Sequence, residues 1–137
     1  TTTARDLAQL ARALVTFPQV REWASLKGIP FDRGTVLLRN PNPLLHRIRG
    51  LDGLRVAPEG EPFAMIATAE RDGMRLIAVV LDAPDGPSCL RQIADLLESG
   101  FARYRRVELV RAGDSLSVSV DVPAGSSPTF AAIAGET

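Results

Sequence analysis

The sequence predicts an α+β fold: an antiparallel sheet flanked by helices and followed by a small β-rich segment. Two stretches with apolar residues at helical spacing, residues 4–15 and 90–101, predict the helices. Between them, two apolar runs separated by Asp72-Gly73 predict a β-hairpin. Beyond Tyr104, short β-like runs alternate with glycine, proline and serine. The length of 137 residues fits one domain, or one domain and part of another.

The first helix is predicted over residues 4–15, where one apolar stripe contains Leu7, Leu10, Ala11 and Leu14. Thr2 or Thr3 can cap its first turn, where Asp6 can interact with the free backbone N–H groups. Pro18 ends this helix because proline disfavours helical backbone in the residue before it.

A second, short helix and a β-ribbon are predicted to follow. The helix covers Gln19–Ser25, with Val20 and Trp23 turned inward and Trp23 acting as a core anchor. Residues Ile29–Leu38 have β-like composition interrupted by Asp32-Arg33-Gly34, which predicts a ribbon or hairpin.

The central hairpin is predicted from Phe63–Glu70 and Met74–Asp82. Asp72-Gly73 favours a two-residue type I′ turn, in which both residues have positive φ. In that register Glu70 lies opposite Arg75, which is a favourable cross-strand pair of opposite charges.

Three further elements are predicted around the hairpin. Leu76–Leu81 is apolar at every position, as is typical of a central strand covered on both faces. An earlier strand is predicted from Asp52 to Ala57. The second long helix turns inward Leu90, Ile93, Leu96, Leu97 and Phe101, with Ser88 as its cap and Gly100 near its end.

The last part of the chain is predicted to be β-rich. Val107–Val110 and Leu116–Val120 are expected to be strands around a turn at Ala112–Asp114. We place a domain boundary near residues 103–106, which gives a first domain over 1–104 and the start of a second over 105–137. The roughly 31 residues after Arg106 are too few to hold a core alone.

Composition excludes several classes of function. Sixteen Lys and Arg balance sixteen Asp and Glu, so bulk charge does not favour a nucleic-acid or membrane-surface partner. The arginines around Tyr104 favour an interdomain or solvated patch over a nucleic-acid contact; they are Arg103, Arg105 and Arg106. No predicted core segment is long enough to span a membrane, and the first residues lack the layout of an export signal.

The sequence predicts no metal and no cofactor. The single histidine, His46, lies in a turn without a second imidazole or thiol, and the single cysteine, Cys89, excludes an internal disulfide. Cys89 at a helix start could have a lowered pKa, but a small buried residue is the simpler reading. Glu59 and Glu61 flank a turn, and no further pattern supports a glycosidase pair.

Four segments, in this order, carry a resemblance to a known family: residues 2–8, residues 39–45 with Arg39-Asn40 and Asn42, Gly50-Leu51-Asp52-Gly53-Leu54, and residues 70–81. Together they resemble the C-terminal half of serine-type D-alanyl-D-alanine carboxypeptidases, the low-molecular-weight penicillin-binding proteins. The resemblance covers about residues 2–104, and residues 107–137 resemble the first strands of that family's β-rich second domain. It implies part of a penicillin-binding or β-lactamase-like fold.

The resemblance also implies a chemistry based on three motifs. In S-x-x-K the lysine accepts the proton of the serine nucleophile, S-x-N lies on a neighbouring loop, and K-T-G binds the substrate's terminal carboxylate. Lys27 is the only lysine, and Ala24 stands three residues before it. Ser25 is one residue too close and falls on another face of the helix. Asn40 and Asn42 follow no serine at the required spacing, so we expect a fragment that lacks both of the first two motifs.

The K-T-G position is expected directly after Gly53-Leu54, and its residues are Arg55, Val56, Ala57 and Pro58. Arg55 keeps a positive charge for a carboxylate, although an ordinary exposed strand arginine is the alternative. Val56 lacks the hydroxyl, and Ala57 adds a methyl group where close backbone approach is expected. Pro58 has no N–H for an oxyanion, and loss of one such donor typically costs about 10²–10³ in rate. We expect a degenerate substrate-binding site and no catalytic residue in this chain.

The predicted function is that of a portion of a D-Ala-D-Ala carboxypeptidase-like, penicillin-binding-type protein of peptidoglycan metabolism, catalytically incompetent as this chain. The alternative is a non-enzymatic module that binds peptidoglycan or a protein on the same fold. The expected partners are the missing N-terminal half or a homo-oligomer partner, and a peptidoglycan peptide; nucleic acid and membrane are not expected. The resemblance implies a periplasmic or extracytoplasmic location.

Overall fold

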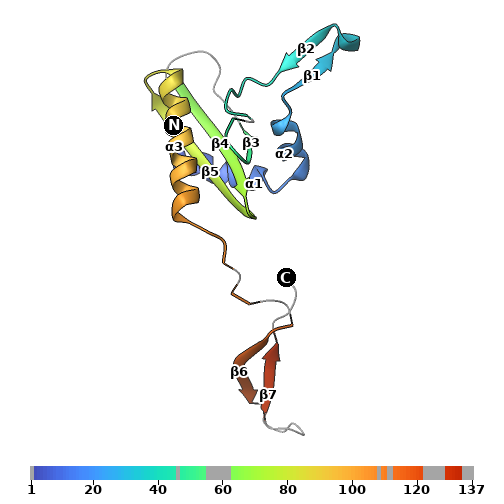
Figure 1. The fold of residues 1–137 in the computed structure, drawn as a ribbon, viewed down its shortest axis with the longest axis vertical. Helices are drawn as coiled ribbons and strands as arrows, with labels where there is room; N and C mark the ends of the chain where they lie inside the picture. The colour runs from blue at the N-terminus through green and yellow to red at the C-terminus, as the bar shows by residue number, and fades with distance from the viewer. Residues whose placement is uncertain are drawn as a thin grey trace. The chain divides into compact units, whose positions relative to one another are not determined.

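The structure is a computed structural model that describes residues 2–45, 47–54, 63–107, 109–110, 113–121 and 129–133. The chain forms two compact units, Thr1–Arg105 and Arg106–Thr137, and each is considered by itself. The first unit contains all the described helices and the three-stranded sheet (Figure 1).

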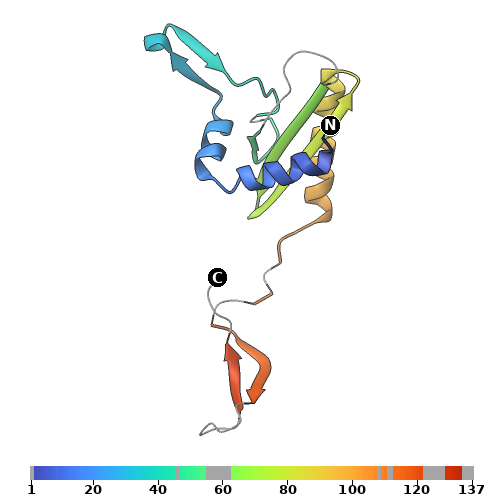
Figure 2. The ribbon, with the colours of Figure 1, turned by 180° about the vertical axis from the view of Figure 1, so that it is seen from behind.

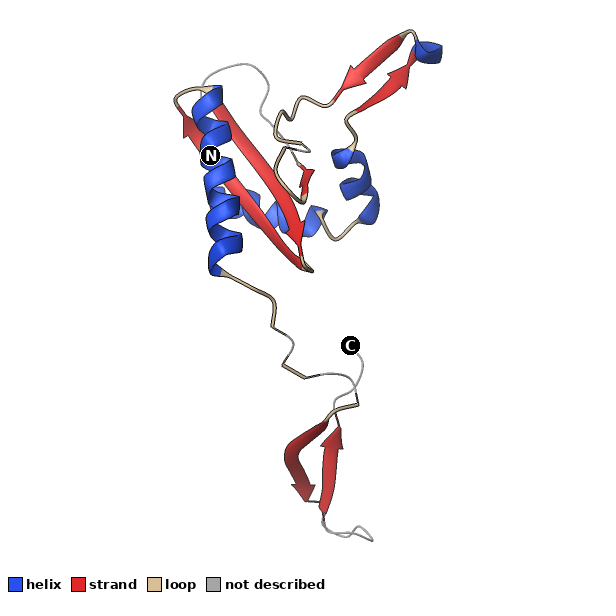
Figure 3. Cartoon of the chain, viewed as in Figure 1, coloured by secondary structure: helices blue, strands red, loops and turns tan. Residues whose placement is uncertain are grey.

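The described elements of the first unit run from two helices through a series of strands to a final long helix (Figure 3). The helices are α1 (Ala4–Leu14), α2 (Pro18–Ser25) and α3 (Gly86–Arg103), with a short 3₁₀ turn, η1 (Asp32–Gly34). The strands are β1 (Gly28–Phe31), β2 (Val36–Arg39), β3 (Leu51–Gly53), β4 (Phe63–Arg71) and β5 (Met74–Ala83).

The main sheet is antiparallel, has the strand order β3-β4-β5, and is covered by helices on both faces. Helix α3 lies on one face, and α1 lies on the opposite face (Figures 1 and 2). The largest buried side chains on the α3 side are Met65, Ile93 and Leu97. This arrangement confirms the predicted α+β class with an antiparallel sheet flanked by helices.

Helix α1 begins as predicted but buries a different stripe. The Thr3 hydroxyl accepts a hydrogen bond from the Asp6 backbone N–H, and the Asp6 carboxylate accepts one from the Thr3 N–H, so Thr3 is the cap. Ala11 and Val15 are buried, whereas Leu10 and Leu14 are exposed, so the predicted stripe is partly wrong. The small Ala11 side chain allows α1 to pack closely on the sheet, whereas Leu10 and Leu14 remain outside this contact.

The hairpin has the predicted register. Glu70 pairs with Arg75 and Arg71 pairs with Met74, so Asp72 and Gly73 form the two-residue turn. Their φ values are 50° and 73°, as a type I′ turn requires.

Replacing Gly73 with valine is expected to lower the free energy of unfolding by about 1–3 kcal/mol, because a β-branched residue resists positive φ. Thermal unfolding followed by circular dichroism measures the change. Asp72→Asn is the control, because asparagine also adopts positive φ in such turns and is expected to leave the melting temperature nearly unchanged. A melting temperature that is unaltered in Gly73→Val would show that the turn does not depend on glycine.

Two predictions around the hairpin need correction. Leu76–Leu81 is covered on both sides, but β5 is the edge strand of the described sheet and β4 is the central one. The cap of α3 is Asp85 and not Ser88: the Asp85 carboxylate accepts the Ser88 backbone N–H at 2.5 Å. The helix starts earlier because Pro87 is favourable in a first turn, where its lack of an N–H is harmless.

Helix α2 and the β1–β2 ribbon are formed as predicted, but most of their large apolar side chains are exposed. Trp23 is 67% exposed, so the prediction that it anchors the core is wrong. The sequence pattern indicates a helix with apolar residues but does not show which of them are covered. In the structure, α2 contacts β3 through Ala24. The ribbon strands pair from Gly28↔Arg39 to Phe31↔Val36.

The second unit contains an antiparallel pair, β6 (Ser115–Asp121) and β7 (Thr129–Ile133). Strand β6 includes the predicted strand Leu116–Val120. Its partner is β7 and not residues 107–110, of which Val107, Leu109 and Val110 are described and lie outside any strand. A β-like run forms a strand only where another strand can complete its hydrogen bonds, and here that strand follows β6 in the chain.

Candidate functional site

The candidate site lies after β3, which is a short strand held against β4. Leu51 pairs with Ala69 and Gly53 pairs with Thr68, with an irregularity between the two pairs. The Leu54 backbone N–H then donates to the Ile66 carbonyl at a long distance of 3.4 Å. The predicted strand Asp52–Ala57 is therefore seen over its first residues, and the later ones lie outside the described part of the chain.

Charged side chains tie β3 to the hairpin. Nη1 of Arg75 lies 2.8 Å from one oxygen of the Asp52 carboxylate and donates to the other at 3.0 Å. The same nitrogen donates to the Thr68 hydroxyl at 2.8 Å, and Nη2 of Arg75 pairs with Glu70. The predicted Glu70–Arg75 pair is thus part of a cluster that also includes a residue of β3.

The turn before β3 is fixed by a close backbone approach. Gly50 has φ of 77°, and a Cβ placed there would lie 2.1 Å from the Glu70 carbonyl oxygen. The Gly50 carbonyl accepts the Glu70 N–H at 2.9 Å, and Nε of Arg71 donates to the Arg49 carbonyl at 2.9 Å. Only glycine fits at this turn, and it brings the chain into β3 at a defined position.

Arg71 also connects the hairpin to α3. Its guanidinium donates to both oxygens of Glu98 and lies 4.3 Å from the centre of the Phe101 ring. The hydrogen bond between them raises the pKa of Arg71 and lowers the pKa of Glu98.

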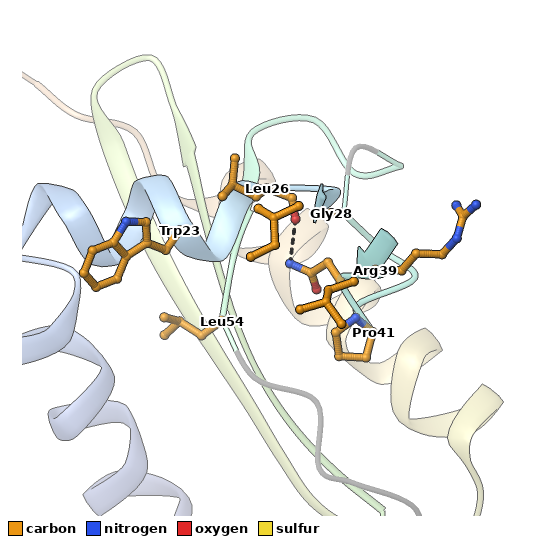
Figure 4. Close-up of a pocket in the computed structure, with 9 residues that line it drawn as sticks. Trp23, Leu26, Gly28, Arg39, Pro41 and Leu54 are labelled. Atoms are coloured by element: carbon orange, nitrogen blue, oxygen red, sulfur yellow. Dashed lines mark hydrogen bonds between the residues drawn. The ribbon is translucent and has the colours of Figure 1, made fainter. Parts of the chain in front are cut away.

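An apolar groove of about 580 Å³ lies between α2, the base of the ribbon and the end of β3. Trp23, Leu26 and Leu54 contribute to its lining, and Figure 4 shows the Arg39 guanidinium directed away from Trp23 and Leu54. The Asn40 side-chain amide closes the turn from α2 to β1 by donating to the carbonyls of Ala24 and Leu26 at 3.0 and 2.9 Å.

Comparison with solved structures identifies the architecture. Penicillin-binding protein D2 from Listeria monocytogenes, in its ampicillin-bound form, is 37% identical with a TM-score of 0.59, over 66% of this chain. A peptidoglycan synthesis regulatory factor (PBP3) from Streptococcus pneumoniae is 25% identical with a TM-score of 0.77, over 98% of this chain. The chain has part of a penicillin-binding-protein fold. The Streptomyces K15 DD-transpeptidase, 23% identical over 74% of this chain with a TM-score of 0.69, has the same fold.

The match is to one part of the penicillin-binding fold. The chain spans 37% of the Listeria protein, 40% of the Streptococcus protein and 42% of the Streptomyces protein. No family model matches the sequence. The resemblance proposed from the sequence is confirmed as a likeness of fold over part of those chains.

The residues expected at the K-T-G position of the penicillin-binding fold, Arg55, Val56, Ala57 and Pro58, lie outside the described residues. His46, Glu59 and Glu61 lie outside them as well. Ser25 and Lys27 both lie in the described part of the chain. The Ser25 hydroxyl donates to the Glu22 carbonyl at 2.8 Å and not to Lys27. The hydroxyl closes the last turn of α2.

The other candidates have structural explanations. Cys89 is buried against the core of the penicillin-binding fold, and burial raises the pKa of its thiol, which makes it less reactive. Within the described residues, no three His, Cys, Asp or Glu side chains gather as metal ligands could. In the same residues, no helix is both long and apolar enough to cross a bilayer.

Sequence reasoning did not find two features of this site. The link from Arg75 to Asp52 needs the pairing of β3 with β4, and no local pattern specifies that pairing. The Asn40 contacts with α2 were also missed, because the Asn-Pro-Asn-Pro sequence indicates a turn without indicating which carbonyls it meets.

Proposed function

We propose that this chain is a portion of a D-Ala-D-Ala carboxypeptidase-like, penicillin-binding-type protein of peptidoglycan metabolism, and that the chain itself is catalytically incompetent. The likeness to penicillin-binding protein D2 at 37% identity supports the first part of the proposal. The second part rests on the sequence that follows β3, where Arg55-Val56-Ala57-Pro58 replaces the motif K-T-G.

Two of the residues after β3 lack a chemical function that the motif requires. Val56 has no hydroxyl to bind a carboxylate, and Pro58 has no N–H to donate to an oxyanion. The described serine nearest to the only lysine is Ser25, whose hydroxyl donates to a backbone carbonyl. The sequence contains no serine three residues before a lysine, so it lacks the S-x-x-K arrangement that activates the nucleophile in this family.

The test is a turnover assay on the isolated chain with diacetyl-L-lysyl-D-alanyl-D-alanine, in which released D-alanine is measured. We expect no release above the buffer control. The triple variant Arg55→Lys, Val56→Thr, Ala57→Gly is expected to remain inactive, because it restores the binding motif without a nucleophile. Release of D-alanine by the unmodified chain would contradict the proposal, and release by the triple variant alone would show that the altered motif is the only defect.

A non-enzymatic module that binds peptidoglycan or a protein is the second candidate, and the exposed apolar side chains favour it. Trp23 and Leu38 lie largely exposed beside the groove of about 580 Å³, and an exposed aromatic at a groove is typical of a binding surface. The two candidates differ in the longer protein: a parent with intact S-x-x-K and S-x-N motifs favours the enzyme reading, and a parent without them favours the binding module.

We also propose that the sheet takes a partner, either the missing N-terminal half or a second copy. Strand β5 is at the edge of the described sheet, and an apolar groove of about 310 Å³ runs beside it, lined by Leu76, Val79, Leu96 and Tyr104 among others. A ten-residue edge strand has unpaired backbone groups that favour pairing with another strand.

Light scattering at increasing protein concentration tests this proposal, and the expected result is a mass above that of one chain. Val79→Pro changes the middle of β5 and is expected to weaken association. A proline at Arg75 would also remove the contact with Asp52, so Val79 is the better position. The proposal would be contradicted if the chain stayed a compact monomer at all concentrations and also failed to bind a separately added N-terminal half.

The organisation and location of the longer protein are part of the same proposal. Residues 1–104 are assigned to the transpeptidase-like portion and 105–137 to the start of a β-rich domain, which the 98% coverage in the Streptococcus match supports. A periplasmic or extracytoplasmic location is proposed from the resemblance to penicillin-binding proteins.

A further inference from the structure

A polar cluster on one face of the sheet joins all three strands. Its central residue is Arg75 of β5, which contacts Asp52 of β3 and both Thr68 and Glu70 of β4. Thr68 and Glu70 alternate with Met65, Ala67 and Ala69 along β4, so the cluster lies on the face opposite to the α3 core.

Three members of the cluster, Arg75, Asp52 and Thr68, are largely sheltered from solvent, whereas the Glu70 side chain is 48% exposed. The side chains of Arg75 and Asp52 are 20% and 24% exposed, whereas those of the Arg49–Asp72 pair are 76% and 86% exposed. The hydroxyl of Thr68, which shares the same guanidinium nitrogen, belongs to a residue that is 1% exposed. Screening by water is therefore weaker at Arg75, and its planar guanidinium can bond to three neighbours at once.

Strand β3 is short, and at its far end Gly53 packs against Ala24 of α2. It has three residues, pairs with β4 at two positions and is irregular between them. The next backbone bond, from the Leu54 N–H to the Ile66 carbonyl, is long at 3.4 Å. The bonds of Gly50 and Arg49 hold the start of β3, and near its end the Asp52 carboxylate adds a polar side-chain contact with Arg75.

We propose that Arg75 is a positioning residue for β3: by holding Asp52 it fixes the end of this strand, directly before the candidate site in the sequence. Arg75 acts through Asp52 and needs no contact with a ligand. The consequence for ligand binding rests on the proposed function, whereas the consequence for β3 does not.

Amide hydrogen exchange, read by NMR at single residues, tests the effect on β3. In Arg75→Met and in Asp52→Asn, exchange at the Leu54 N–H is expected to become at least about ten-fold faster, with a change of less than about three-fold at the Ile93 N–H within α3. Arg75→Lys keeps the charge but cannot bond to three neighbours in one plane, so an intermediate effect is expected. Arg49→Met removes the exposed pair and is the control, with no change expected at Leu54.

The double variant Asp52→Asn, Arg75→Met separates coupling from independent effects. It is expected to exchange at Leu54 no faster than the faster single variant, because both substitutions act on the same contact: Asp52→Asn removes its negative charge and Arg75→Met removes its donor. Equal acceleration at Leu54 and Ile93, or additive effects of the two substitutions, would overturn the proposal, since Arg75 would then only stabilise the whole unit.

Binding of diacetyl-L-lysyl-D-alanyl-D-alanine, measured by NMR titration, tests the consequence for the site. If the unmodified chain binds this peptide, Arg75→Met is expected to weaken binding about ten-fold and Arg49→Met to leave it unchanged. Unchanged affinity with a loosened β3 would overturn the positioning role. If the unmodified chain does not bind the peptide, peptide recognition fails as a function, and the exchange pattern still decides whether Arg75 positions β3.

Discussion

Gly50→Ala is expected to lower the free energy of unfolding by roughly 2–4 kcal/mol, the sum of backbone strain and a weakened hydrogen bond. The strain arises because φ is 77° at Gly50. The hydrogen bond is the one that the Gly50 carbonyl accepts from Glu70, and a new Cβ would lie 2.1 Å from the Glu70 carbonyl oxygen, so the two segments must move apart. Urea unfolding measures the change.

Gly34→Ala is the matched control for this substitution. Its φ is 92°, but a Cβ there meets no atom within 4 Å, so only the backbone strain remains. Its expected loss is about 1 kcal/mol. Equal losses at Gly34 and Gly50 would contradict the view that the approach of the turn to β4 determines the effect.

Ile93→Ala is expected to lower the free energy of unfolding by about 2–5 kcal/mol, because it leaves a cavity between α3 and the sheet. Ile93 is completely buried and belongs to the main core cluster. Leu96→Ala is the control on the same helix, since Leu96 is 48% exposed, and its expected loss is less than about 1 kcal/mol. Comparable losses at both positions, measured by urea unfolding, would contradict the assigned packing of α3.

The sequence predicts those parts of this fold that depend on neighbouring residues. The Asp72-Gly73 turn determined the hairpin register, and with it the Glu70–Arg75 pair, because turn geometry and strand alternation are local. The start of α3 was misplaced by three residues because Asp85 and Ser88 are both good capping residues. Pro87 in the first turn, together with the Asp85 side chain, decides between them.

Burial of the N-terminal side chains could not be predicted in the same way. Leu10, Leu14 and Trp23 have the apolar character of core residues, but whether a side chain is covered depends on surfaces distant in the sequence. The position of the candidate site came from a family resemblance around Gly53-Leu54, while the contacts that hold β3 there, from Arg75 and at Gly50, depend on non-local pairing.

Catalytic incompetence of this chain is tested most directly by covalent labelling with a fluorescent penicillin, read on a denaturing gel and by intact-mass spectrometry. A penicillin-binding protein with an intact S-x-x-K motif is the positive control, and the chain unfolded in denaturant controls for non-specific labelling. The account predicts no adduct on the folded chain, because Ser25 has no lysine placed to accept its proton. A stoichiometric adduct on Ser25, or on any other serine of the folded chain, would contradict it.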